Sequence, residues 1–140
     1  MTDGFVTWLH TQLDEHERVV KAAPPGPWTV DGSGSIVAAD GSRVVLSVGG
    51  KLDGRVSRWP EGPAAAHIVA CDPVRVLQDI DAKRQLLQGM EQAEFTLRAA
   101  GVGTSPHDLM TGAVNSLRRA ARLAAAPYSS RPGYREEWRP

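Results

Sequence analysis

The stretch from Pro73 to Ala100 constrains the fold more than any other feature, because after its first residue it contains no proline and only one glycine. Asp72 precedes it and can act as an N-cap, while proline is well tolerated at the first helical position. Gly101 follows it and offers a C-terminal cap. The sequence therefore predicts one long helix over 73–100 that serves as the spine of the protein.

Two further stretches carry apolar residues at the three- and four-residue spacing of an amphipathic helix. The first, 3–22, ends before the segment APPGP, because proline cannot continue a helix. The second, 106–126, follows Ser105, which opens a sequence with the form of a capping box, and it stops at Pro127. A short helix over 63–70 is expected just before the long one.

Short apolar runs within 28–48 alternate with the turn segments DGSG and ADGS. Asp-Gly between apolar runs favours a β-hairpin, so this region predicts a small antiparallel meander that must pack on a helix. The next segment, 49–62, is expected to be a loop because of its glycine, proline and charged residues. The predicted fold is a single α+β domain over 1–140, with three main helices, a β-meander between the first and second, and an ordered aromatic tail over 127–140.

Charge and composition exclude several classes of function. Sixteen basic and sixteen acidic residues give a formal net charge of +0, so no global field attracts nucleic acid or an anionic membrane. A single cysteine excludes an internal disulfide, and the N-terminus lacks the basic and apolar segments of a signal peptide. No apolar stretch approaches the ~18 residues of a membrane span. We therefore expect a cytoplasmic protein without membrane contact.

His67 and Cys71, four residues apart, are the first candidates for a metal or catalytic site. A zinc site needs at least three protein ligands, and the other histidines lie on other predicted elements. No nucleophile motif or phosphate-binding loop accompanies the pair. We expect no metal, no cofactor and no catalytic residue, and we interpret both side chains as local packing residues. A pocket near His67, in a small enzyme or ligand-binding protein, is the alternative.

Arg118, Arg119 and Arg122 gather in the last turns of the helix over 106–126. Cations are favourable there because they interact with the negative end of the helix dipole. The alternative is a contact with nucleic-acid phosphates, which the neutral charge of the whole chain disfavours.

The tail combines three aromatic residues, Tyr128, Tyr134 and Trp138, with interleaved arginines and glutamates. A disordered tail would be poor in aromatic residues. We expect Tyr134 and Trp138 to fold back on the chain's own helices, with the neighbouring charges pointing outward. The alternative is contact with a partner, because Tyr, Trp and Arg dominate binding hot spots. The candidate interaction residues are Tyr134, Trp138, Arg135, Arg139, Arg118 and Arg122.

Two segments carry a resemblance to a known family. AAAHIVACDPVRVLQDIDAKRQLL (64–87) and the ending APYSSRPGYREEWRP (126–140) resemble a small actinobacterial and actinophage family of unknown function, domain-of-unknown-function family 6221. The segment FVTWLHTQLDEHERVVKAA (5–23), followed by Trp28, is similar in layout. Members of that family often carry a second histidine where Cys71 stands here, and another near Gln88.

The resemblance brings no activity, cofactor or substrate with it. It implies a cytoplasmic protein of a high-GC Gram-positive bacterium or of its phage. The sequence favours a non-enzymatic accessory or regulatory protein that acts by protein–protein contact, either with an unknown protein partner or with a second copy through helix faces.

Overall fold

The computed structural model describes residues 2–52 and 55–140, and the chain divides into two compact units. The first unit comprises the chain up to Glu15 together with Ile80–Pro140, and the second comprises His16–Asp79. Both boundaries fall inside helices, so α1 (Thr2–Ala22) and α3 (Pro73–Ala99) each contribute residues to both units. The predicted α+β fold class is confirmed. None of the described helices is both long enough and apolar enough to cross a membrane. The single domain over 1–140 stays a prediction.

In the second unit a three-stranded antiparallel sheet has the order β1-β2-β3, as predicted for the meander. Its strands are very short: β1 (Thr29–Val30), β2 (Ile36–Val37) and β3 (Arg43–Val45). The turn between β1 and β2 depends on Asp31, whose carboxylate accepts hydrogen bonds from the Ser33 hydroxyl at 2.6 Å and the Ser33 amide at 2.8 Å. The hydroxyl bond is the main cause that lowers the pKa of Asp31 below its ordinary value.

The prediction of a loop over 49–62 is wrong for most of this segment. The structure instead has an antiparallel pair, β4 (Val48–Leu52) and β5 (Arg55–Trp59), with Val48 opposite Trp59 and Leu52 opposite Arg55. The two residues between the strands, 53–54, lie outside the described residues. In the sequence they are Asp-Gly, the pair that hairpins favour, whereas the two glycines at the start of the segment wrongly suggested a loop.

The start of α3 is built as predicted. α2 (Gly62–Ala70) ends just before it, and Asp72 Oδ1 accepts a hydrogen bond from the Arg75 amide at 3.2 Å, which is the N-cap interaction. Gly26 passes so close that a Cβ added to it would lie 2.9 Å from Asp72 Oδ1. A side chain at this position would therefore collide with the cap.

The helix α4 (Ser105–Ala125) begins one residue earlier than the capping box indicated. Its N-cap is Thr104, whose hydroxyl accepts a hydrogen bond from the His107 amide at 3.3 Å, and not Ser105. Thr104 has the extended backbone that an N-cap needs, whereas Ser105 is already helical. The proline that follows Ser105 lies within the first turn, where its missing N–H is harmless.

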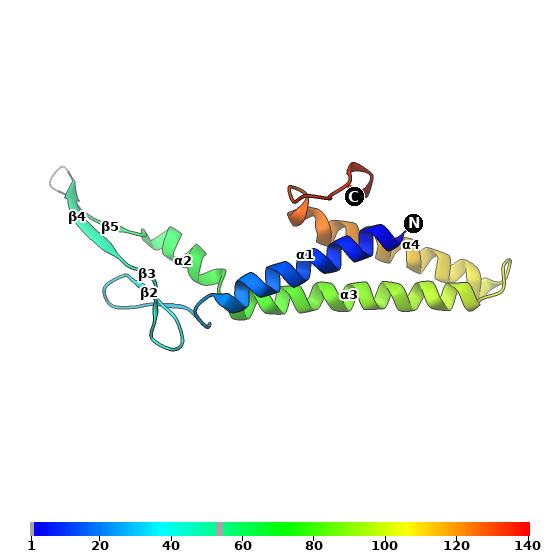
Figure 1. Ribbon diagram of the computed structural model, residues 1–140, viewed down its shortest axis with the longest axis horizontal. Helices are drawn as coiled ribbons and strands as arrows, with labels where there is room; N and C mark the ends of the chain where they lie inside the picture. The colour runs from blue at the N-terminus through cyan, green and yellow to red at the C-terminus, as the bar shows by residue number, and fades with distance from the viewer. Residues whose placement is uncertain (1, 53–54) are drawn as a thin grey trace. The chain divides into compact units, whose positions relative to one another are not determined.

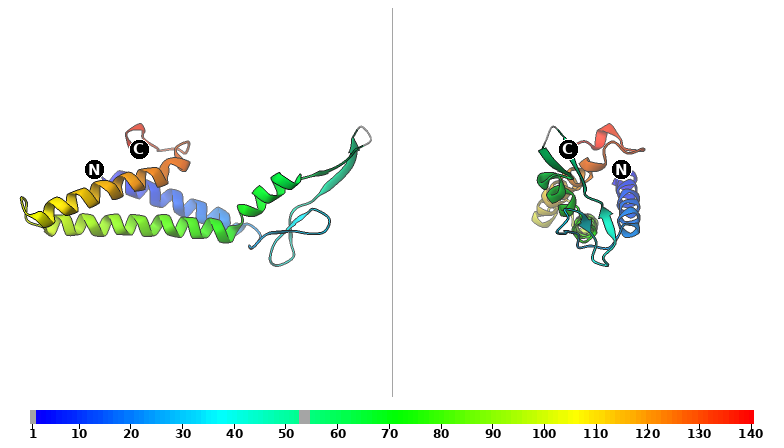
Figure 2. Two further views of the ribbon diagram at one scale, coloured as in Figure 1. Left: turned by 180° about the vertical axis from the view of Figure 1, so that it is seen from behind. Right: turned by 90° about the vertical axis from the view of Figure 1, so that its left-hand side faces the viewer.

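The first unit packs three helical segments side by side: the start of α1, the later part of α3, and α4 (Figure 1, Figure 2). Arg84 of α3 donates to Asp14 of α1 at 2.7 Å, and Arg118 of α4 donates to Glu94 of α3 at 2.9 Å. The largest fully buried apolar side chains of this unit come from all three segments and follow the helical spacing; they are Leu9, Leu13, Ile80, Leu87, Met90 and Val114.

The C-terminal tail lies against α1 and continues through η1 (Ala126–Tyr128) and η2 (Glu136–Trp138). Trp138 is 6% exposed, and its ring centroid lies 5.5 Å from that of Phe5 and 5.3 Å from that of Trp8. Trp8 Nε1 also donates to the carbonyl of Pro132 at 3.0 Å. The tail therefore packs on the chain's own first helix.

Replacing Asp72 with alanine removes the side-chain acceptor that caps α3. We expect Asp72→Ala to lower the free energy of unfolding by about 1 kcal/mol, and Asp72→Asn, which keeps a good cap, to lower it much less. Urea denaturation followed by circular dichroism measures both values. Equal stability of the two variants would show that the cap contributes nothing.

Replacing Trp138 with alanine removes the buried ring that joins the tail to α1. We expect Trp138→Ala to lower the free energy of unfolding by about 3 kcal/mol, because the loss of a buried Trp leaves a cavity. The matched control is Arg139→Ala, whose side chain is 71% exposed, and which should change the stability by less than about 0.5 kcal/mol. Identical denaturation midpoints for Trp138→Ala and the wild type would contradict this role of the tail.

Candidate functional site

The candidate residues of the tail divide into buried aromatic rings and exposed charges. Trp138 is buried and Tyr134 is half-buried, with its ring 5.4 Å from Trp8. Arg135 and Arg139 have largely exposed side chains, and they pair with the neighbouring Glu137 and Glu136. The aromatic rings thus make contacts within the chain, whereas the arginines and glutamates beside them are largely exposed.

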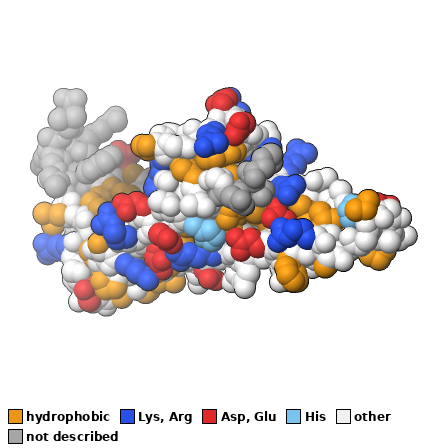
Figure 3. Space-filling view, turned by 45° about the vertical axis from the view of Figure 1, so that its right-hand side comes forward, with side chains coloured by type: hydrophobic (Ala, Val, Ile, Leu, Met, Phe, Trp, Pro, Cys, Tyr) orange, Lys and Arg blue, Asp and Glu red, His pale blue; other side chains and the backbone are white. Residues whose placement is uncertain are grey.

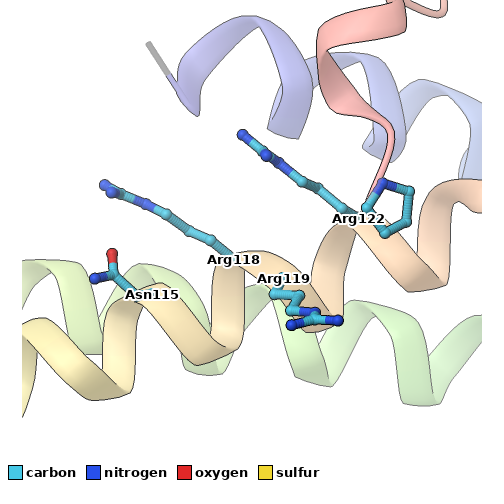
Figure 4. A pocket seen from close by; sticks show the side chains of 5 residues that line it. Asn115, Arg118, Arg119 and Arg122 are labelled. Atoms are coloured by element: carbon cyan, nitrogen blue, oxygen red, sulfur yellow. The ribbon is translucent and has the colours of Figure 1, made fainter.

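A groove on α4 brings together the arginines at the end of this helix. It encloses about 500 Å³ and is lined by Asn115, Arg118, Arg119, Arg122 and Pro140. We call it the arginine groove. Figure 4 shows Arg118 and Arg122 extending from α4 in parallel, whereas Arg119 turns the other way. Pro140 belongs to the tail, so the helix and the tail together form the groove.

The arginines of the groove differ in their partners. Arg118 donates from Nε to Glu94 Oε1 at 2.9 Å, and the Glu94 side chain is only 11% exposed. Arg122 is half-buried, and the described part of the chain provides no hydrogen-bond or ion-pair partner for it. Arg119 is exposed and is likewise unpaired within the described residues. The groove therefore contains one anchored guanidinium and two that can meet an external anion.

His67 and Cys71 line a second pocket, in the other compact unit. This pocket encloses about 380 Å³, and its lining also includes His16, Arg75 and Asp79. Cys71 is an exposed free thiol at the C-terminal end of α2. Among residues 2–52 and 55–140, no group of three or more His, Cys, Asp and Glu side chains is placed to hold a metal ion. The pocket offers hydrogen-bonding and charged groups to a small molecule.

A third feature is a group of exposed apolar side chains where α3 and α4 meet. Phe95 is 62% exposed, Val102 is 89% exposed and Leu109 is 74% exposed. We call these three residues the distal apolar surface. Figure 3 shows apolar side chains on the surface at this end of the helical hairpin. Because water surrounds them, their burial against another molecule would be favourable.

The sequence analysis did not identify several of these residues as candidates for a functional site. The ion pair of Glu94 with Arg118 spans 24 residues, beyond any local pattern. Phe95 and Asn115 received no role. The spacing of Asn115 and Arg118, three residues apart on a predicted helix, could have placed the two side chains on one face.

Comparison with curated proteins and with solved structures finds no match for this chain. One family profile does match it, the Family of unknown function (DUF6221), over residues 2–140. The match covers both compact units and includes the tail. The chain therefore belongs to the DUF6221 family, whose function is unknown.

Proposed function

We propose that this chain is a non-enzymatic accessory or regulatory protein that acts by binding another protein. The observation that carries this proposal is the distal apolar surface, formed by Phe95, Val102 and Leu109. Single exposed apolar residues are common on soluble proteins and need no explanation. Here three large ones lie at one end of a helical hairpin, which is a more unusual arrangement.

The positions of these residues support a shared contact surface. Phe95 and Val102 are seven residues apart, and Ala99 between them is also exposed. Phe95 and Ala99 lie one turn apart on one face of α3, and Val102 lies in the turn that follows the end of this helix at Ala99. Leu109 lies within the first turns of α4, just beyond the connection. Full burial of each large side chain would contribute about 1.5–3 kcal/mol. A partner with a complementary apolar surface could gain affinity from all three.

The partner is expected to present apolar side chains with charges at the edge. Arg98 and Asp108 lie between the residues of the distal apolar surface in the sequence and are both exposed. Interfaces commonly combine an apolar centre with a polar rim. A second copy of this chain meets the same description, so the oligomeric state must be measured together with binding to other proteins.

A second candidate function is the binding of a small molecule in the pocket beside His67. The observation in its favour is the lining, which combines two histidines with Cys71, Arg75 and Asp79. Concave sites with convergent polar groups are the usual form of ligand sites. Because the described residues form no metal cluster, this candidate rests on hydrogen bonding and charge.

We also propose that the protein comes from an actinobacterium or its phage and acts in the cytoplasm. The support is the resemblance of residues 64–87 and 126–140 to sequences of such organisms.

The proposed contact is tested with the double variant Phe95→Ser/Val102→Ser. We expect it to lose at least tenfold in affinity for a protein captured from actinobacterial lysate, identified by mass spectrometry and then purified for titration. The matched control, Val19→Ser/Leu46→Ser, replaces two exposed apolar residues elsewhere and should bind as the wild type does. Light scattering reports whether the partner is a second copy.

The outcome of the same titration can also reject the proposal. If the distal variant keeps full affinity while its circular dichroism spectrum is native, the distal apolar surface is not the contact. If His67→Ala alone abolishes binding, the pocket beside His67 takes its place.

A further inference from the structure

We propose that the arginine groove binds the phosphate group of a small molecule. This site is separate from the distal apolar surface and does not depend on the proposed protein contact. The inference rests on the side chains that line the groove, on the ion pair that anchors one of them, and on the charge that remains uncompensated.

The spacing of the lining residues places them on one side of α4. Asn115, Arg118, Arg119 and Arg122 lie at positions i, i+3, i+4 and i+7 of the helix. Arg118 and Arg122 are therefore separated by about 6 Å along the helix axis, and they extend in parallel (Figure 4). An oxyanion between their two guanidinium groups could accept hydrogen bonds from both.

The ion pair with Glu94 holds Arg118 in position before any ligand arrives. The bond to Glu94 uses Nε, and the described residues offer no partner to the two terminal nitrogens of Arg118. A long side chain that is already ordered loses less conformational entropy on binding. Glu94 therefore acts as a positioning residue, and the terminal nitrogens remain available to an anion.

The charge of the groove favours an anion. Three arginines line it, and no acidic side chain is among its lining residues in the described part of the chain. Glu94 compensates Arg118, whereas Arg122, which extends parallel to Arg118 (Figure 4), has no partner in the described chain. Arg119 is also unpaired there, but it turns the other way. Arg122 is half-buried, where a missing counterion costs more than at full exposure. A phosphate monoester or diphosphate supplies oxygen acceptors to both Arg118 and Arg122 at one place.

The chemistry of arginine favours phosphate over the alternatives. The planar guanidinium donates paired hydrogen bonds to phosphate oxygens, which a lysine cannot do. A single carboxylate offers two oxygen acceptors, whereas a phosphate group offers three that Arg118 and Arg122 can share. A nucleic-acid backbone needs a longer basic track, whereas these arginines span little more than one turn of one helix and the chain has a net charge of +0.

The test is calorimetric titration of the full chain with sodium pyrophosphate at low ionic strength. We expect saturable binding of one pyrophosphate per chain. The variant Arg122→Gln should weaken it by about tenfold or more, because it removes a charge-assisted hydrogen-bond donor. The matched control Arg75→Gln removes one arginine from the pocket beside His67 and should leave the binding constant unchanged.

Three results would overturn the proposal. The first is equal binding of pyrophosphate by the wild type and Arg122→Gln. The second is loss of binding in Arg75→Gln, which would move the site to the other pocket. The third is binding of a single-stranded oligonucleotide without binding of pyrophosphate, which would assign the groove to nucleic acid. The variant Phe95→Ser/Val102→Ser should still bind pyrophosphate, so the failure of the protein contact and the failure of this site are distinguishable.

Discussion

The burial of one face of α3 within the first unit is the constraint on which the other features depend. Leu87 and Met90 are almost completely removed from water, which fixes the rotation of the helix about its axis. Glu94 lies one turn beyond Met90, so the same rotation brings its carboxylate to α4 and to Arg118. The rotation also leaves Phe95, the next residue, on the exposed side. The burial of this face of α3 thus determines both that Glu94 pairs with Arg118 and that the Phe95 ring is exposed.

The aromatic tail has a structural role that also shapes a site. Trp138 packs on Phe5 and Trp8, and this contact brings the last residue of the chain, Pro140, to the edge of the arginine groove. Gly133 makes the close approach possible, because it has a positive φ of 83° and a Cβ there would lie 3.1 Å from the Trp8 ring. The folding of the tail and the form of the groove are therefore coupled.

The two proposed binding surfaces use different physical forces. The distal apolar surface would gain affinity from the removal of apolar side chains from water, which depends little on salt. The arginine groove would gain affinity from charge-assisted hydrogen bonds, which weaken as salt screens the charges. Both surfaces belong to the hairpin of α3 and α4, so this hairpin provides most of the residues for the two proposed binding sites of the first unit.

The sequence by itself determined the features that depend on near neighbours. Asp72 caps α3 because an N-cap and the amide that donates to it are three residues apart, and the Asp-Gly turns of the meander act over two residues. The tertiary structure alone decided which faces meet. The bond from Trp8 to Pro132 spans 124 residues and the pair of Arg118 with Glu94 spans 24, and no local pattern encodes such distances. Helical spacing shows which side chains share a face, but only packing against other segments shows whether that face is buried, paired or open to a ligand.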